Sequence, residues 1–200
     1  MRILLIGHGA REHAIAEAFR RNKTVELFSY MKSKNPGIFS LSKSIELGSY
    51  SDLEKIKKFA GENEIDFTFI GPEDPLSFGV VDALQDIGIE SIGPTKLMAR
   101  LETSKSFTRE LLQKYKIDGN PEFRVFSKEN FDDLRVFLNY LDQVVVKPDG
   151  LTGGKGVKVQ GDHFKTKDEA LDYCREVLET HPAVIVEEKM DGEEFSLQCL

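Results

Sequence analysis

Two lysines and four glycines lie close together between residues 147 and 156, and their spacing is suited to binding phosphate. Lys147 ends a run of three valines and Lys155 lies in the loop that follows; the glycines are Gly150, Gly153, Gly154 and Gly156. Glycine tolerates positive φ and a close ligand, so the N–H groups of such a loop can face phosphate oxygens. No Gly-Lys-Ser or Gly-Lys-Thr sequence occurs there, which excludes a Walker loop. Valines on both sides predict a strand, a glycine-rich loop and a returning strand, although an exposed hairpin with solvated lysines has the same composition.

Acidic residues follow the next apolar strand. The run Val184-Ile185-Val186 leads into Glu187 and Glu188, and Glu193 and Glu194 come shortly after. A solvated acidic edge would show the same four glutamates. Lys147 is the more informative residue, because a charge directly after three buried-type valines needs a partner.

A second candidate site lies near the N-terminus. An apolar run over residues 3–6 ends in Gly7-His8-Gly9, and a helical pattern begins at Ala10. Unpaired N–H groups at the start of that helix can bind an anion at the carboxyl end of the first strand. The third glycine of the dinucleotide fingerprint is missing and no acidic residue closes the second strand, so NAD binding is not expected.

Strands alternate with helices over the first hundred residues, which predicts a parallel sheet with helices on both faces. Residues 7–11 and 71–75 would then lie at the same edge, where ligands gather in such sheets. Asp118-Gly119-Asn120-Pro121 is the best linker candidate, because these residues stop regular structure. We therefore expect domains at 1–118 and 119–190, with residues 191–200 beginning a further part.

Composition places the chain among soluble globular proteins, with 40% hydrophobic and 30% charged residues. The net charge of −7 argues against binding to nucleic acid or to an acidic membrane. Cys174 and Cys199 show no metal-type spacing, so we expect a reduced, cytoplasmic protein. The first apolar run stops at Gly7 and is too short for a signal peptide or a membrane span.

Several segments together resemble the phosphoribosylamine–glycine ligase family of the ATP-grasp superfamily, in that family's order and over the whole chain. The matching segments are Ile6-Gly7-His8-Gly9-Ala10-Arg11-Glu12-His13-Ala14, Gly71-Pro72-Glu73-Asp74-Pro75-Leu76, Gly93-Pro94-Thr95-Lys96, Ser104-Lys105-Ser106-Phe107, Val146-Lys147-Pro148-Asp149-Gly150-Leu151, Gly153-Gly154-Lys155-Gly156-Val157 and residues 187–195. The chain departs from the family at His8 and Ala10, which replace glycines, and at Pro148, which replaces alanine. The family's chains are about twice as long, so the resemblance implies an N-terminal half.

The resemblance implies an α/β fold: a doubly wound parallel sheet of the pre-ATP-grasp type, then the small α+β ATP-grasp lid and the start of a truncated core. It also implies ATP-dependent ligation of glycine to 5-phosphoribosylamine through glycyl phosphate, in purine biosynthesis. The implied ATP-binding residues are Lys105, Lys147, Gly153, Gly154, Lys155, Gly156, Glu187, Met190 and Glu194. The implied substrate-binding residues are Gly9, Arg11, Glu12, Glu73 and Asp74. We expect no covalent nucleophile, magnesium ligands outside this chain, and an inactive fragment whose partner is the missing C-terminal half.

Two alternatives remain open. One is a different ATP-grasp carboxylate–amine ligase, although Arg11-Glu12-His13 and Gly71-Pro72-Glu73 argue against it. The other is a non-catalytic nucleotide-binding module that senses ATP. His13 lies inside the first predicted helix, where a packed histidine is expected rather than a catalytic one.

Overall fold

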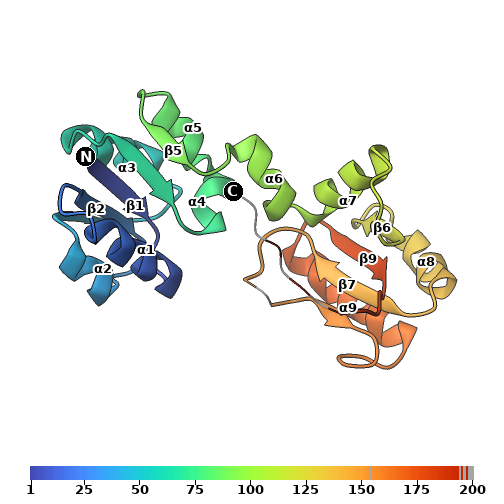
Figure 1. Cartoon of the computed structure of the whole chain (residues 1–200). Helices are drawn as coiled ribbons and strands as arrows, with labels where there is room; N and C mark the ends of the chain where they lie inside the picture. The colour runs from blue at the N-terminus through green and yellow to red at the C-terminus, as the bar shows by residue number, and fades with distance from the viewer. Residues whose placement is uncertain (154, 194, 196, 198–200) are drawn as a thin grey trace. The chain divides into compact units, whose positions relative to one another are not determined.

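The computed structural model of the chain describes residues 1–153, 155–193, 195 and 197. These form two compact units, Met1–Thr103 and Ser104–Leu200, each with its own sheet (Figure 1). Within the described residues, every helix is too short or too polar to cross a membrane.

The first unit contains a five-stranded parallel sheet in the order β3-β2-β1-β4-β5. Its strands are β1 (Arg2–Ile6), β2 (Glu26–Met31), β3 (Ser44–Leu47), β4 (Phe67–Ile70) and β5 (Glu90–Ile92). β1 lies in the centre, paired with β2 on one side and with β4 on the other. Parallel strands place their carboxyl ends at one edge, so the segments after β1 and β4 lie side by side there.

Helices cover both faces of this sheet. They are α1 (Ala10–Arg20), α2 (Pro36–Leu41), α3 (Leu53–Glu62), α4 (Glu73–Phe78), α5 (Val80–Gln85) and α6 (Lys96–Thr103). Successive side chains of a strand point to opposite faces, and β1 shows this clearly. Leu4 and Ile6 pack in one core with Ile56 of α3, whereas Leu5 packs in a second core with Ala16 of α1. The predicted doubly wound parallel sheet is confirmed.

The second unit contains a four-stranded antiparallel sheet in the order β6-β9-β7-β8. Its elements are α7 (Lys105–Lys114), β6 (Phe123–Phe126), the 3-10 helix η1 (Phe131–Asp133), α8 (Leu134–Tyr140), β7 (Val144–Pro148), β8 (Lys158–Val159), α9 (Lys167–Thr180) and β9 (Val184–Glu188). The strand, glycine-rich loop and returning strand that the sequence predicts are β7, residues 149–157 and β8. The small α+β lid is therefore confirmed as a fold.

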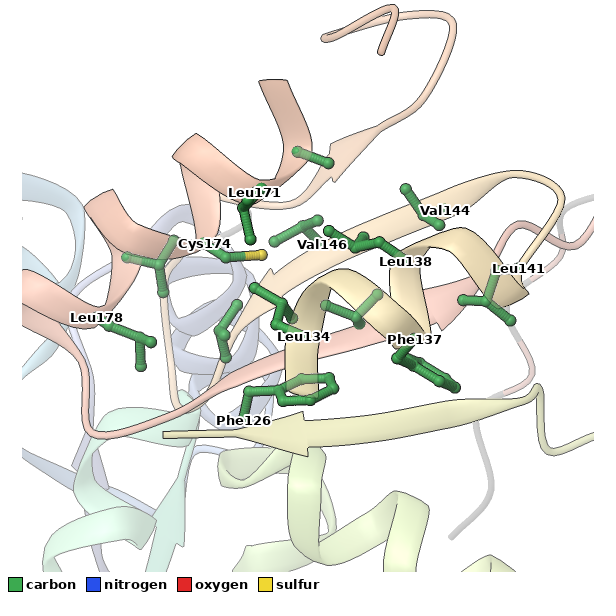
Figure 2. Close-up of a cluster of buried hydrophobic side chains, with 14 of the residues drawn as sticks. Phe126, Leu134, Phe137, Leu138, Leu141, Val144, Val146, Leu171, Cys174 and Leu178 are labelled. Carbon is green, nitrogen blue, oxygen red and sulfur yellow. The ribbon is translucent and has the colours of Figure 1, made fainter. Parts of the chain in front are cut away.

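Figure 2 shows the core of this unit, in which α8 and α9 cover one face of the sheet. Val144 and Val146 of β7 meet Leu138 of α8 and Leu171 and Cys174 of α9, all of them buried. A capping box starts α9: Thr166 accepts a hydrogen bond from the N–H of Glu169, whose carboxylate accepts one in return. Because α8 and α9 lie on one face, the alternate residues of β7 and β9 point to the other.

The compact units divide after Thr103, so α7 belongs with the second sheet. Side chains of α7 account for this, since Lys105, Ser106 and Arg109 bond to residues of that unit. The sequence predicts a division into 1–118, 119–190 and 191–200, with a linker at 118–121. That division stays a prediction.

Candidate functional site

The face of the second sheet opposite α8 and α9 carries charged side chains. Val144 and Val146 of β7 point to the core, so the alternate residue Lys147 points away from it. In β9, Val186 is in the core and Glu187 is not. The antiparallel pairing places Glu187 opposite Val145, which precedes Lys147 by two residues and lies on the same face. Strand alternation and register therefore bring a lysine and a glutamate together on this face.

Glu187 is the centre of a buried ion cluster. Its side chain is 3% exposed, and its carboxylate accepts hydrogen bonds from Lys147 Nζ at 2.6 Å and from Arg109 Nε and Nη2 at 2.8 and 3.0 Å. Burial opposes ionisation, but these hydrogen bonds outweigh it, so the pKa of Glu187 lies below its usual value. The carboxylate is thus held charged between two cations.

A cavity of about 420 Å³ opens beside this cluster. Its apolar lining includes Val145, Val157, Val159 and Met190. Its charged lining is more extensive and consists of Arg109, Lys147, Lys189, Asp162, Glu187, Glu188 and Asp191. Such a mixture of apolar surface and convergent charges suits a small molecule that has both apolar and charged parts. Three of the predicted nucleotide residues, Lys147, Glu187 and Met190, therefore line one cavity.

Lys105 lies in the first turn of α7 and meets the start of the glycine-rich loop. Its Nζ donates a hydrogen bond to the carbonyl oxygen of Gly150 at 2.6 Å. Positive φ angles of 95°, 60° and 96° at Gly150, Gly153 and Gly156 explain the glycines at those positions. The structure thus joins Lys105 to the loop, as the predicted phosphate site requires.

Lys155 takes a different position. It is exposed and lines a separate cavity of about 400 Å³, between the loop and α9, together with Tyr173. Tyr173 donates a hydrogen bond to the carbonyl oxygen of Gly156 at 2.6 Å, which fixes the end of the loop to α9. The predicted residues Gly154 and Glu194 lie outside the described residues.

Glu12 organises the turn that follows β1 in the first unit. Its side chain is 4% exposed, and Oε2 accepts a hydrogen bond from the N–H of Gly9 at 2.6 Å. A Cβ at Gly7 or Gly71 would lie only 2.4 or 2.3 Å from the Glu12 side chain. These two glycines therefore make room for a buried carboxylate, which explains the glycine after each of β1 and β4.

Charged residues from three segments gather at the same edge of the sheet. Arg11 Nη2 lies 3.5 Å from Glu73 Oε1, and Lys32 Nζ lies 3.8 Å from Asp74 Oδ2. The predicted substrate residues are thus adjacent, with Arg11 and Glu73 paired. Lys32, directly after β2, joins them although the sequence analysis did not single it out.

His8 and its neighbours hold the backbone of the turn. His8 Nδ1 lies 2.8 Å from the hydroxyl of Tyr50, and burial raises the pKa of Tyr50 to about 12, so that hydroxyl stays protonated. Asn35 Nδ2 donates to the carbonyl oxygens of His8 and Gly9. His13 instead packs beside Gly37 and lies 3.5 Å from Glu17, which agrees with a structural role.

Among the described residues, no three His, Cys, Asp or Glu side chains are grouped closely enough to hold a metal ion.

The sequence analysis missed four residues at these two sites: Arg109, Tyr50, Asn35 and Lys32. Asn35 had a usable signal, because Asn followed by Pro marks the start of a helix. An arginine within a helix carries no comparable signal.

Comparison with known proteins places both units in one family. The model of the phosphoribosylglycinamide synthetase N domain matches residues 1–102, and that of the phosphoribosylglycinamide synthetase ATP-grasp (A) domain matches residues 103–200. Phosphoribosylamine–glycine ligase of Methanobrevibacter smithii is 48% identical over 204 residues, which cover 100% of this chain and 46% of that protein. The same enzyme of Methanocaldococcus jannaschii is also 48% identical, over 98% of this chain and 46% of its own length. The chain spans about half the length of the curated relatives it matches.

Solved structures show the same arrangement of elements. Phosphoribosylamine–glycine ligase from Thermotoga maritima has a TM-score of 0.74 and 26% identity, over 96% of this chain and 45% of that one. D-alanine–D-alanine ligase from Bacillus anthracis, solved with ATP, has a TM-score of 0.63 and 22% identity, over 96% of this chain and 60% of that one. The second likeness concerns the fold alone.

Proposed function

The chain belongs to the phosphoribosylglycinamide synthetase family, and we propose that it forms the N-terminal part of an ATP-dependent phosphoribosylamine–glycine ligase. The whole enzyme would join glycine to 5-phosphoribosylamine through glycyl phosphate, giving glycinamide ribonucleotide, ADP and phosphate. Because the chain spans about half of its relatives, we assign the complete activity to a longer protein that also supplies the glycine site. The partners of this chain would be small molecules and that remaining part.

The cavity beside Glu187 carries the proposal, because its lining fits a nucleotide. Val145, Val157 and Val159 offer apolar surface for a purine ring, and Lys147 offers a positive charge for phosphates. Glu187 and the backbone near Met190 would lie at the adenine edge, and Glu194 would accept hydrogen bonds from the ribose. The ion pair with Glu187 keeps the ammonium of Lys147 at the cavity wall.

The triphosphate would extend towards Lys105 and the glycine-rich loop. Gly153, Gly154 and Gly156 would present N–H groups to it, and Lys155 would reach it by moving with the loop. Catalysis would come from positioning and charge neutralisation. Magnesium would supply further charge neutralisation on the phosphates, and we place its carboxylate ligands in the remaining part of the longer protein.

The edge of the first sheet fits a phosphorylated sugar amine. Gly9 is the N-cap of α1 and Arg11 is exposed near it, so an anion such as a 5′-phosphate can meet N–H groups and a guanidinium. Glu73 and Asp74 would accept hydrogen bonds from ribose hydroxyls or the amine. Glu12 would support this site by accepting a hydrogen bond from the N–H of Gly9, which holds the turn in its conformation.

Calorimetry on this chain tests the nucleotide site. ATP should bind more tightly than adenosine, and Lys147→Ala should weaken ATP binding by about tenfold, the effect of losing one charge-assisted hydrogen bond. Lys128→Ala is the matched control, because Lys128 is an exposed lysine of the same unit. Equal ATP affinity in wild type and Lys147→Ala would contradict the proposal.

A second titration tests the sugar-phosphate site. Ribose 5-phosphate should shift the amide resonances of Gly9 and Ala10, and Arg11→Ala should reduce those shifts. Arg21→Ala, at the opposite end of the same helix, serves as the control. Shifts confined to residues 149–157 would show that the phosphate binds elsewhere.

A further inference from the structure

Asp149 is the first residue of the glycine-rich loop, directly after β7, and its carboxylate is held by several donors. Oδ1 accepts hydrogen bonds from the N–H groups of Ser106 at 3.2 Å and of Gly150 at 2.9 Å. Oδ2 accepts one from the hydroxyl of Ser106 at 2.5 Å. The hydroxyl of Ser104 lies 3.5 Å from both oxygens. One side chain at the end of β7 thus contacts the first turn of α7, over forty residues away in the sequence.

This position is favourable for a carboxylate. The first N–H groups of a helix have no partner within the helix and carry a partial positive charge. Ser104, the N-cap of α7, accepts a hydrogen bond from the N–H of Phe107, and Asp149 accepts one from the N–H of Ser106. Because a carboxylate of this chain already occupies the start of α7, a nucleotide phosphate is not needed there.

Lys105 lies between the two serines that contact Asp149. Its ammonium donates to the carbonyl oxygen of Gly150, the residue directly after Asp149. Asp149 therefore bonds to Ser104 and Ser106, which are the residues on each side of Lys105. It also bonds to Gly150, the residue that Lys105 contacts. These bonds fix the start of α7 and the start of the loop in one arrangement.

We propose that Asp149 is a positioning residue for Lys105, holding the first turn of α7 against the entry of the glycine-rich loop. Asp149 does not contact the nucleotide; it acts through Lys105, which thereby meets the same polyphosphate as the loop. The inference rests on the proposed ATP site of this unit. Removing Asp149 leaves Lys105 in the chain but lets its ammonium move away from the loop.

A double-mutant cycle tests this dependence. Asp149→Ala and Lys105→Ala should each weaken ATP binding to this chain by about tenfold. The ATP affinity of the double variant should be no lower than that of the weaker-binding single variant. Affinity for adenosine should stay unchanged, because the effect concerns phosphate. Asp142→Ala, an exposed aspartate just before β7, should bind ATP as the wild type does. Asp149→Asn keeps one acceptor oxygen for the two N–H groups and should restore most of the affinity.

Hydrogen exchange separates this inference from the proposed ATP site. Without nucleotide, Asp149→Ala should speed amide exchange at Ser106 and Gly150, and Asp142→Ala should not. If Asp149→Ala speeds this exchange but the wild-type chain binds no ATP, the proposed ATP site is wrong and Asp149 only holds α7 against the loop. Wild-type affinity in Asp149→Ala, or losses that multiply in the double variant, would overturn the inference. If Asp149→Ala fails to fold, Ser106→Ala removes the hydroxyl donor alone, and wild-type ATP affinity in that variant would likewise overturn it.

Discussion

Replacing Glu187 by glutamine should destabilise the second unit strongly. The Glu187 side chain is 3% exposed and lies between Arg109 and Lys147, which are each 22% exposed. Glutamine removes the negative charge and turns an N–H₂ group towards two cations that can only donate. Breaking a buried ion pair costs about 3–5 kcal/mol, and the partial exposure of the two cations reduces this to about 2–4 kcal/mol.

The size of this effect should depend on pH. The unfolded-chain pKa of Glu187 is close to 4.5; burial raises the folded-state value, but the hydrogen bonds from Arg109 and Lys147 lower it further. A carboxyl group with a depressed pKa stabilises the fold above its unfolded pKa, and that stabilisation is lost as the pH falls through the folded pKa. The difference between wild type and Glu187→Gln should therefore be constant from pH 7 down to about 5 and shrink below it.

Urea unfolding measures the free energy directly. The chain contains no tryptophan, so far-ultraviolet circular dichroism and tyrosine fluorescence are the suitable signals. The unfolding curve should be fitted with a separate transition for each of the two units. Glu179→Gln, an exposed glutamate of α9, is the control and should change stability by less than about 0.5 kcal/mol. An equal effect of the two substitutions, or a Glu187→Gln effect that persists unchanged at pH 3, would refute the reasoning.

Three further predictions concern the second unit and its linker. Limited trypsin digestion should cut after Lys116, the basic residue nearest to the predicted linker at 118–121, or after Lys155 in the glycine-rich loop; protection of both sites, with cuts elsewhere, would contradict the predicted boundary. Tyr173→Phe should weaken ATP binding about threefold and speed exchange across the glycine-rich loop, whereas the exposed Tyr140→Phe should do neither. Cys174 is buried with its pKa raised to about 12, so Cys174→Ser should leave the thiol reactivity of the native chain at pH 8 unchanged; a decrease would contradict its burial.

Much of the fold was predictable because local patterns and tertiary packing agree. Three valines before Lys147, with a glycine-rich loop after it, predicted β7 and its returning strand. The sequence analysis missed α2, β3 and α4. All three are short, and the four residues of β3 (Ser-Ile-Glu-Leu) are the minimum length over which alternation of polar and apolar residues indicates a strand.

The candidate sites were less predictable, because they depend on contacts between distant residues. Lys147 was expected to have a partner, and Glu187, forty residues later, is that partner. Arg109 could not be chosen from the other arginines, since its contact with Glu187 arises only when α7 packs beside β9. The position of Lys155 on the α9 side of the loop also follows from the tether at Tyr173, which no local pattern specifies.

The ion cluster around Glu187 is difficult to explain by stability alone. Burying three charged groups is expensive, and well-packed apolar side chains of similar volume often stabilise a fold as much or more. Under the proposed function, Lys147 at the cavity wall would bind a phosphate. Without that phosphate, Glu187 is the partner that holds the lysine charged and in place. Because Arg109 also bonds to Glu187, Lys147 would be able to turn towards the phosphate without leaving Glu187 unpaired.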